Sequence, residues 1–245
     1  MKQNKYDNAA FFEQYSMMPR SISGLSAAGE WHELKAMLPE LKGKRVLDLG
    51  CGFGWHCRYA RDQQASSVTG VDISANMLNK AREMTDDPQI KYLQQAIEDV
   101  DFENEQFDVV ISSLALHYVE SFDETVQKVY AMLSAEGTFI FSLEHPVFTA
   151  LAAQDWHYDD KGEIMHWPVD HYHAEGLRET SFLGNDVMKY HRTAATYMNT
   201  LIRAGFEIKQ IAEPKPSEEM LSTTAGMKDE LRRPIFLMIA AQKRR

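Results

Sequence analysis

The sequence is poor in cysteine, in basic residues and in long uncharged apolar runs. Its 245 residues include only Cys51 and Cys57, too few for a disulfide framework or a credible metal site. Lys and Arg number 26 against 36 Asp and Glu, and the net charge of −10 argues against a broad nucleic-acid-binding surface. No uncharged run is long enough to span a bilayer, and residues 1–20 lack the apolar core of a signal peptide. We therefore expect a cytoplasmic protein that binds neither nucleic acid nor membranes.

One stretch of the chain has the pattern of a buried strand that runs directly into a glycine-rich turn. The strand residues Val46-Leu47-Asp48-Leu49, apolar except for Asp48, are followed by glycine at every second position, Gly50, Gly52 and Gly54. Such a turn, followed by a helix-compatible run, lets a ligand approach the backbone where side chains would block it. The stretch therefore predicts a nucleotide-binding site.

Two acidic residues and the glycine spacing indicate which nucleotide binds. The dinucleotide pattern Gly-x-Gly-x-x-Gly requires glycine at the position of Trp55, so the spacing is wrong for NAD. Asp48 would repel a pyrophosphate at the following helix N-terminus but would attract an ammonium group. A second predicted strand ends at Asp72, roughly twenty residues on, where a carboxylate binds ribose hydroxyls. A nucleoside joined to an amino acid fits both acids, which suggests S-adenosylmethionine.

Together with Phe107-Asp108-Val109-Val110, these segments resemble the successive motifs of class I S-adenosylmethionine-dependent methyltransferases, in particular the type 11 branch. The resemblance extends over about residues 45–145. It implies an α/β fold with a Rossmann-like, doubly wound, seven-stranded and mostly parallel sheet whose last strand is antiparallel. It also implies methyl transfer from S-adenosylmethionine to a small-molecule acceptor, with S-adenosylhomocysteine as product and no metal.

The chain is expected to form one domain with four consecutive parts. These are lid helices over residues 1–40, a cofactor-binding core over 41–144, an inserted cap after the fifth strand over 145–192, and the remaining core over 193–245. The lid contains helices predicted at 5–18 and 25–38. The insertion is rich in Trp, His and Tyr, includes a predicted β-hairpin, and is longer than a simple connection needs. We therefore expect it to bind the acceptor.

The predicted cofactor-binding residues come from the lid, the glycine turn and the loops after the first four strands. They are Tyr15, Arg20, Asp48, Gly50, Gly52, Gly54, Asp72, Ile73, Met77, Ala96, Ile97, Glu98, Ser113 and Leu114. Ala96 stands where the resembling family commonly has an aspartate. Recognition of the adenine amine would therefore use Glu98, a carbonyl or water, while the backbone of Ile97 keeps the contact implied by the family.

Histidines supply the candidates for a general base. His117 follows the fourth strand, His145 and His191 flank the insertion, and Glu144 is a further candidate, although each is also compatible with a purely structural role. Six of the nine histidines lie in the insertion, but no cysteine is nearby and the spacing is no established zinc motif, so we predict no metal. Two other functions stay open, a non-catalytic protein that binds S-adenosylmethionine or its product, and an NAD(P)-dependent oxidoreductase. The acceptor and the oligomeric state, including a possible homodimer, are undetermined.

Overall fold

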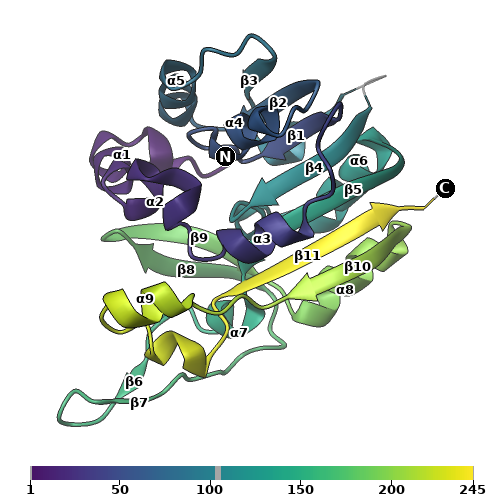
Figure 1. The fold of residues 1–245 in the computed structure, drawn as a ribbon. Coiled ribbons are helices and arrows are strands. Elements are labelled where there is room, and N and C mark those ends of the chain that lie inside the picture. Colours follow the sequence, from purple (N-terminus) through teal and green to yellow (C-terminus); the bar gives the residue numbers. More distant parts are fainter. Residues whose placement is uncertain (1, 103–105, 245) are drawn as a thin grey trace.

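The structure, a computed structural model, describes residues 2–102 and 106–244. Its centre is a seven-stranded sheet with the order β10-β11-β5-β4-β1-β2-β3 (Figure 1). The strands are β1 (Arg45–Leu49), β2 (Ser67–Asp72), β3 (Ile90–Gln94), β4 (Phe107–Ser113), β5 (Leu133–Glu144), β10 (Phe206–Ala212) and β11 (Phe236–Lys243). Strands β1 to β5 pair in parallel, whereas β11 is antiparallel to both β5 and β10. The predicted fold class is confirmed.

Helices cover both faces of the sheet because the inner strands are apolar on both sides. One face packs against α6 (Phe122–Met132) and α8 (Ala194–Arg203), and the other against α3 (Trp31–Met37), α4 (Trp55–Asp62) and α5 (Ala75–Glu83). In β5, Phe139 and Phe141 belong to the first core, whereas Ile140 belongs to the second. This alternation leaves the strand ends, and the loops that follow them, as the place for a ligand.

The N-terminal segment consists of short helical pieces rather than two long helices. They are η1 (Lys5–Asp7), α1 (Ala9–Ser16), α2 (Pro19–Ile22) and η2 (Gly24–Ala27). Pro19 ends the first predicted helix and begins α2, where its missing N–H costs nothing. The Asp7 carboxylate accepts hydrogen bonds from the Ser74 hydroxyl at 2.6 Å and the Asn76 N–H at 3.0 Å. The lid is thereby attached to the N-terminus of α5.

The insertion contains a short helix and two antiparallel pairs. They are α7 (Pro146–Thr149), β6 (His157–Tyr158) with β7 (Ile164–His166), and β8 (Gly176–Phe182) with β9 (Asn185–His191). The β8–β9 pair confirms the predicted hairpin, and Leu183 and Gly184 both have positive φ at its two-residue turn. The alternation of Tyr172, Ala174 and Gly176 in the sequence predicts that the first strand begins at Tyr172, but it begins at Gly176 because residues 171–174 form a turn. The pair β6–β7 was not predicted.

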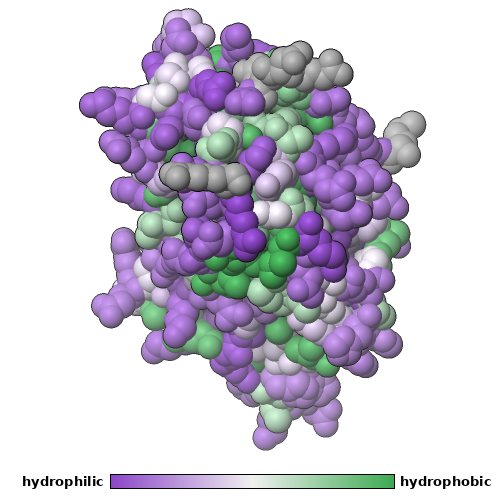
Figure 2. Space-filling model, turned by 90° about the vertical axis from the view of Figure 1, so that its right-hand side faces the viewer, coloured by the Kyte–Doolittle hydropathy of each residue, from purple (hydrophilic) through white to green (hydrophobic). Residues whose placement is uncertain are grey.

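The remaining elements are η3 (Ile97–Asp99), η4 (Leu116–Tyr118), α9 (Glu218–Thr223) and η5 (Asp229–Arg232). In residues 2–102 and 106–244, no helix is long and apolar enough to cross a membrane. Figure 2 shows a mostly hydrophilic surface with a hydrophobic area near its centre and smaller ones elsewhere on this face. Exposed apolar side chains include Ile202 of α8 and Ile211 of β10. Nothing in the fold shows what covers them, and the homodimer stays a prediction.

Candidate active site

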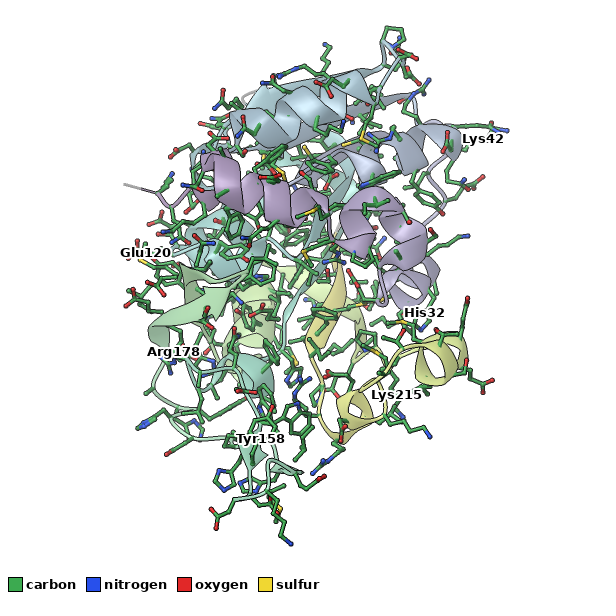
Figure 3. All side chains as sticks on the ribbon, turned by 90° about the vertical axis from the view of Figure 1, so that its left-hand side faces the viewer. His32, Lys42, Glu120, Tyr158, Arg178 and Lys215 are labelled. Carbon is green, nitrogen blue, oxygen red and sulfur yellow. The ribbon has the colours of Figure 1, made fainter. Side chains whose placement is uncertain are left out.

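The strand order reverses between β1 and β4, the point at which open parallel sheets bind ligands. The loops after these strands open into a cavity of about 850 Å³. The glycine turn and the lid line one side, and residues from β5 and the β8–β9 hairpin line the other. Glu120 lies at the exposed rim, where α1 and the hairpin face each other (Figure 3). The volume is sufficient for a nucleoside cofactor and a small acceptor.

The three glycines of the turn all have positive φ, but they serve different purposes. A Cβ at Gly50 would lie 2.4 Å from the Cβ of Ala115, and one at Gly54 would lie 2.2 Å from the Tyr92 hydroxyl. Both positions therefore need glycine for packing within the protein. At Gly52 the nearest atom would be the Met77 Cε at 3.4 Å, so this backbone faces the cavity. Gly50 and Gly52 line the cavity, whereas Gly54 does not.

Asp72 links the turn to the next loop. One carboxylate oxygen accepts the Gly52 N–H and the other accepts the Ser74 N–H, both at 2.9 Å. Burial raises the pKa of Asp72 to about 6. Each oxygen can accept a second hydrogen bond, and the side chain lines the cavity. Asp72 fixes the glycine turn, and its contact with ribose hydroxyls stays a prediction.

Asp48 lies behind the turn rather than in the cavity wall. Its side chain is buried, and one oxygen accepts a hydrogen bond from the Cys57 thiol at 3.3 Å. The other oxygen has no hydrogen-bond partner in the described part of the chain. Burial, reinforced by the charge of Asp72, raises the pKa of Asp48 to about 7. An ammonium group bound at the turn would stabilise the ionised form of Asp48. A contact between such a group and Asp48 stays a prediction.

The lid closes one end of the cavity with polar and aromatic groups. Tyr15 and Arg20 line it as predicted, and Arg20 is ion-paired with the buried Glu30. Trp55, at the start of α4, also lines this end, and its buried Nε1–H has no partner within the described ranges. In the sequence, Trp55 was noted only because it occupies the position of the third glycine of the dinucleotide-binding pattern. An unpaired indole donor and an arginine that line the same cavity suit the carboxylate of an amino-acid ligand.

All but Asp48 and Gly54 of the predicted cofactor residues line this one cavity. The remaining lining residues from that set are Ile73, Met77, Ala96, Ile97, Glu98, Ser113 and Leu114. Leu114 has a φ of 53°, and its N–H donates to the Ser142 carbonyl at 2.9 Å, which holds the loop after β4 in place. The site therefore fits S-adenosylmethionine. It combines the glycine turn with Asp72, the unpaired Nε1–H of Trp55 and the guanidinium of Arg20.

The structure separates the three candidate histidines. Only His117 lines the cavity. His145 caps α7 by accepting the Val147 N–H at 3.0 Å, and its Nε2 contacts Glu213 at 2.9 Å. His191 is buried between the Thr149 hydroxyl at 2.8 Å and the Tyr172 carbonyl at 2.9 Å. These contacts give His145 and His191 structural roles outside the cavity wall, and a role for either as a general base has no geometric support.

A buried ion pair that sequence reasoning did not identify lies at the acceptor side. The Lys189 ammonium donates to Glu144 at 2.6 Å and to Gln154 at 3.0 Å, and all three side chains line the cavity. Burial lowers the pKa of the neighbouring His117 to about 4. Val187, Lys189 and His191 are the buried positions of β9, so a lysine on the buried face of a strand was the available signal.

The insertion is held against the segment before β11 by two arginines, and Arg232 donates hydrogen bonds to the Ile164 and Met165 carbonyls. The Arg233 guanidinium lies 4.0 Å from the ring centre of Trp167, 4.8 Å from Phe148 and 5.0 Å from Trp156. Phe148 lines the cavity, as do Ile235 and Phe236 just after Arg233. No group of three or more His, Cys, Asp or Glu in the described ranges is placed to hold a metal. The absence of a metal stays a prediction.

The fold and this site define a class I S-adenosylmethionine-dependent methyltransferase. A family model described as a methyltransferase domain matches residues 47–141. A crystal structure from Listeria monocytogenes, named as an S-adenosylmethionine-dependent methyltransferase, is 53% identical, with a TM-score of 0.86 over 91% of this chain and 100% of that one. A Mesorhizobium loti protein of the same name is 42% identical, with a TM-score of 0.84 over 90% and 100%. The chain belongs to this family, is an enzyme and uses S-adenosylmethionine.

A relative with a named acceptor matches over a shorter stretch. The malonyl-[acyl-carrier protein] O-methyltransferase of Enterobacter lignolyticus is 40% identical over 109 residues, which cover 44% of this chain and 42% of that enzyme. The chain therefore matches less than half of that relative's length. The acceptor of this protein has to be argued from its own site.

Proposed function

We propose that this enzyme methylates a small-molecule acceptor that binds between the cofactor turn and the insertion over residues 145–192. The observation that carries the proposal is the single cavity, which joins the predicted cofactor residues to Glu144, Gln154 and Lys189. The cofactor supplies a methyl group on a sulfonium, and transfer is an in-line displacement that needs alignment and exclusion of water. The lid and the β8–β9 hairpin supply this enclosure.

The acceptor side combines apolar walls with a few polar groups, as sites for small molecules do. Phe148, Phe182, Val187 and Phe236 form apolar parts of the lining. The exposed rim includes Glu120 and Glu124, and the whole chain carries a net charge of −10, which disfavours a nucleic-acid substrate. The cytoplasmic location stays a prediction.

The experiment is incubation with methyl-labelled S-adenosylmethionine and a fractionated metabolite extract, followed by identification of the labelled product. The Asp72→Ala variant is the matched control, because its weakened cofactor binding should reduce labelling at a subsaturating cofactor concentration. We expect a labelled metabolite from the wild type and less label from the variant. Cofactor binding with no labelled metabolite from any fraction would favour a non-catalytic binding protein. Calorimetry with NAD tests the oxidoreductase alternative, and no heat is expected.

A further inference from the structure

The acceptor side of the cavity contains a cation with one donor left over. The Lys189 ammonium has three N–H donors, and two of them go to the Oε1 atoms of Glu144 and Gln154. Gln154 also donates to the second oxygen of Glu144 at 2.9 Å and accepts from the Thr180 hydroxyl at 2.9 Å. In the described part of the chain, no third acceptor contacts the Lys189 ammonium. Because Lys189 is buried yet lines the cavity, its third N–H is available to a bound ligand.

His117 presents a second donor to the same space. Its Nδ1 accepts the backbone N–H of Glu144 at 3.4 Å, so the neutral ring carries its proton on Nε2. Among the residues that the structure describes, Nε2 has no hydrogen-bond partner. The His117 side chain lines the cavity next to Glu144. The imidazole therefore offers an N–H to the ligand and has no free nitrogen with which to take a proton from it.

The groups around these two donors are poor bases. Burial raises the pKa values of Tyr6, Tyr118 and Tyr190, so their hydroxyls stay protonated. Burial alone would raise the pKa of Glu144, but His117, the Lys189 ammonium and hydrogen bonds from Lys189 and Gln154 hold that pKa below its ordinary value. Both oxygens of Glu144 are already engaged.

A hydroxyl or an ammonium acceptor has to lose a proton when it is methylated, whereas a carboxylate does not. We propose that the acceptor is a carboxylic acid, bound as its carboxylate by the Lys189 ammonium and the His117 Nε2–H, and that the product is its methyl ester. This inference rests on the proposed function and names the class of acceptor. A carboxylate oxygen forms the bond to the methyl carbon, the carbon–sulfur bond breaks, and its electron pair stays on sulfur. No proton is released and no base is required.

Charge and shape at this side support the assignment. The charges of Lys189 and Glu144 cancel, so this pair does not repel an anion. The positive charge of the bound cofactor attracts an anionic acceptor. Esterification removes the negative charge of the acceptor and with it the ion pair to Lys189, which favours product release. The surrounding apolar residues, including Phe148, Phe182 and Ile235, suit a carboxylic acid that carries an apolar chain or ring.

The chemical test uses the alkali lability of methyl esters. The enzyme is incubated with methyl-labelled S-adenosylmethionine and extract, and also with acids such as decanoic and phenylacetic acid, each paired with the alcohol and the amine of the same carbon skeleton. We expect label from acids only, released as volatile methanol by mild alkali. An alkali-stable labelled metabolite would overturn the carboxylate assignment and leave the proposed function intact. No labelled small molecule in any fraction would overturn the proposed function itself.

The test of the residues uses a charge-neutral pair of substitutions. Lys189→Met alone leaves Glu144 buried without its cation and is expected to destabilise the fold, so the double variant Lys189→Met/Glu144→Gln is measured beside it. In the folded double variant, S-adenosylhomocysteine affinity should stay within about twofold, while the KM for the acid rises about tenfold to a hundredfold, the loss of a charge-assisted hydrogen bond. An unchanged KM would show that the pair is structural and would overturn the assignment of Lys189.

Discussion

The buried carboxylate of Asp48 predicts an unusual dependence of stability on pH. Its side chain is 1% exposed, and one oxygen has no partner in the described ranges. Burial raises the pKa of Asp48 to about 7 in the folded protein, from about 4 in the unfolded chain. The folded state therefore keeps a proton that the unfolded state releases between these values. The contribution of Asp48 to stability is full below pH 4 and is lost as the pH rises through 7.

The magnitude follows from the pH interval. Between pH 5 and pH 8, the folded protein holds the extra proton over about two pH units. Because one pKa unit corresponds to about 1.4 kcal/mol, the wild type should lose about 3 kcal/mol of unfolding free energy through this group. Asp48→Asn keeps the shape of the side chain, has no ionisable group and removes this loss. The variant should therefore gain about 3 kcal/mol relative to the wild type on going from pH 5 to pH 8.

The assay is urea unfolding of both proteins at pH 5 and pH 8. The result is the change in unfolding free energy of Asp48→Asn between the two pH values minus the same change for the wild type. Groups that do not interact with Asp48 are shared by both proteins, and their contributions cancel. Asp108→Asn is a matched control on the neighbouring strand β4. Burial raises the pKa of Asp108, but hydrogen bonds from Arg45 and Ser134 outweigh it and hold the pKa below its ordinary value. The difference in unfolding free energy between the wild type and Asp108→Asn should be the same at pH 5 and at pH 8.

Parallel behaviour of wild type and Asp48→Asn across this interval would refute the reasoning, because it would mean that Asp48 is ionised or protonated throughout.

The charge of Asp48 also links stability to cofactor binding. An ammonium group at the glycine turn stabilises ionised Asp48, so S-adenosylhomocysteine should bind the wild type more tightly at pH 8 than at pH 6. Calorimetry should show that Asp48→Asn weakens binding at pH 8 and removes this pH dependence.

Three further substitutions test other parts of the site. Asp72→Ala should weaken S-adenosylhomocysteine binding by about 1.5 to 3 kcal/mol, the range for hydrogen bonds to a charged group, and an unchanged dissociation constant in calorimetry would remove Asp72 from the site. Arg233→Met should lower the unfolding free energy by about 1 to 3 kcal/mol through the loss of its aromatic contacts, whereas equal stability in urea would show that these contacts contribute nothing. His191→Ala should cost about 1 to 3 kcal/mol of stability because it leaves the Thr149 hydroxyl and a buried carbonyl unpaired. Lost turnover of the identified acceptor at unchanged stability would instead make His191 catalytic.

The fold was predictable because its signals are local. The apolar run that forms β1, the glycine turn and the acid at the end of β2 lie within a few tens of residues, and each has a direct structural consequence. The mostly parallel sheet with an antiparallel last strand followed from the resemblance. Element boundaries were less predictable where tertiary contacts decide them. The lid breaks into short helices at Pro19, and the hairpin starts at Gly176 because a turn precedes it.

The reasons behind the glycines were only partly predictable. The pattern indicated a close approach of ligand and backbone, and this applies to Gly52. Gly54 is required by the hydroxyl of Tyr92, which belongs to β3 and lies almost forty residues away. The hydrogen bonds of Asp72 to the turn likewise depend on tertiary structure. A sequence motif therefore locates the cofactor site without separating residues that touch the ligand from those that shape the turn.

The acceptor side has no local signature for the same physical reason. Its polar groups, His117, Glu144, Gln154 and Lys189, come from the loop after β4, the end of β5, the start of the insertion and the hairpin. None of them stands out in the sequence of its own segment. The fold brings them together in a buried space, where the Lys189 ammonium and the His117 N–H can contact one ligand. Histidines were the natural candidates in the sequence because they titrate near neutrality. A carboxylate acceptor needs charge and hydrogen-bond donors instead of a base, and such a site forms only when distant segments pack together.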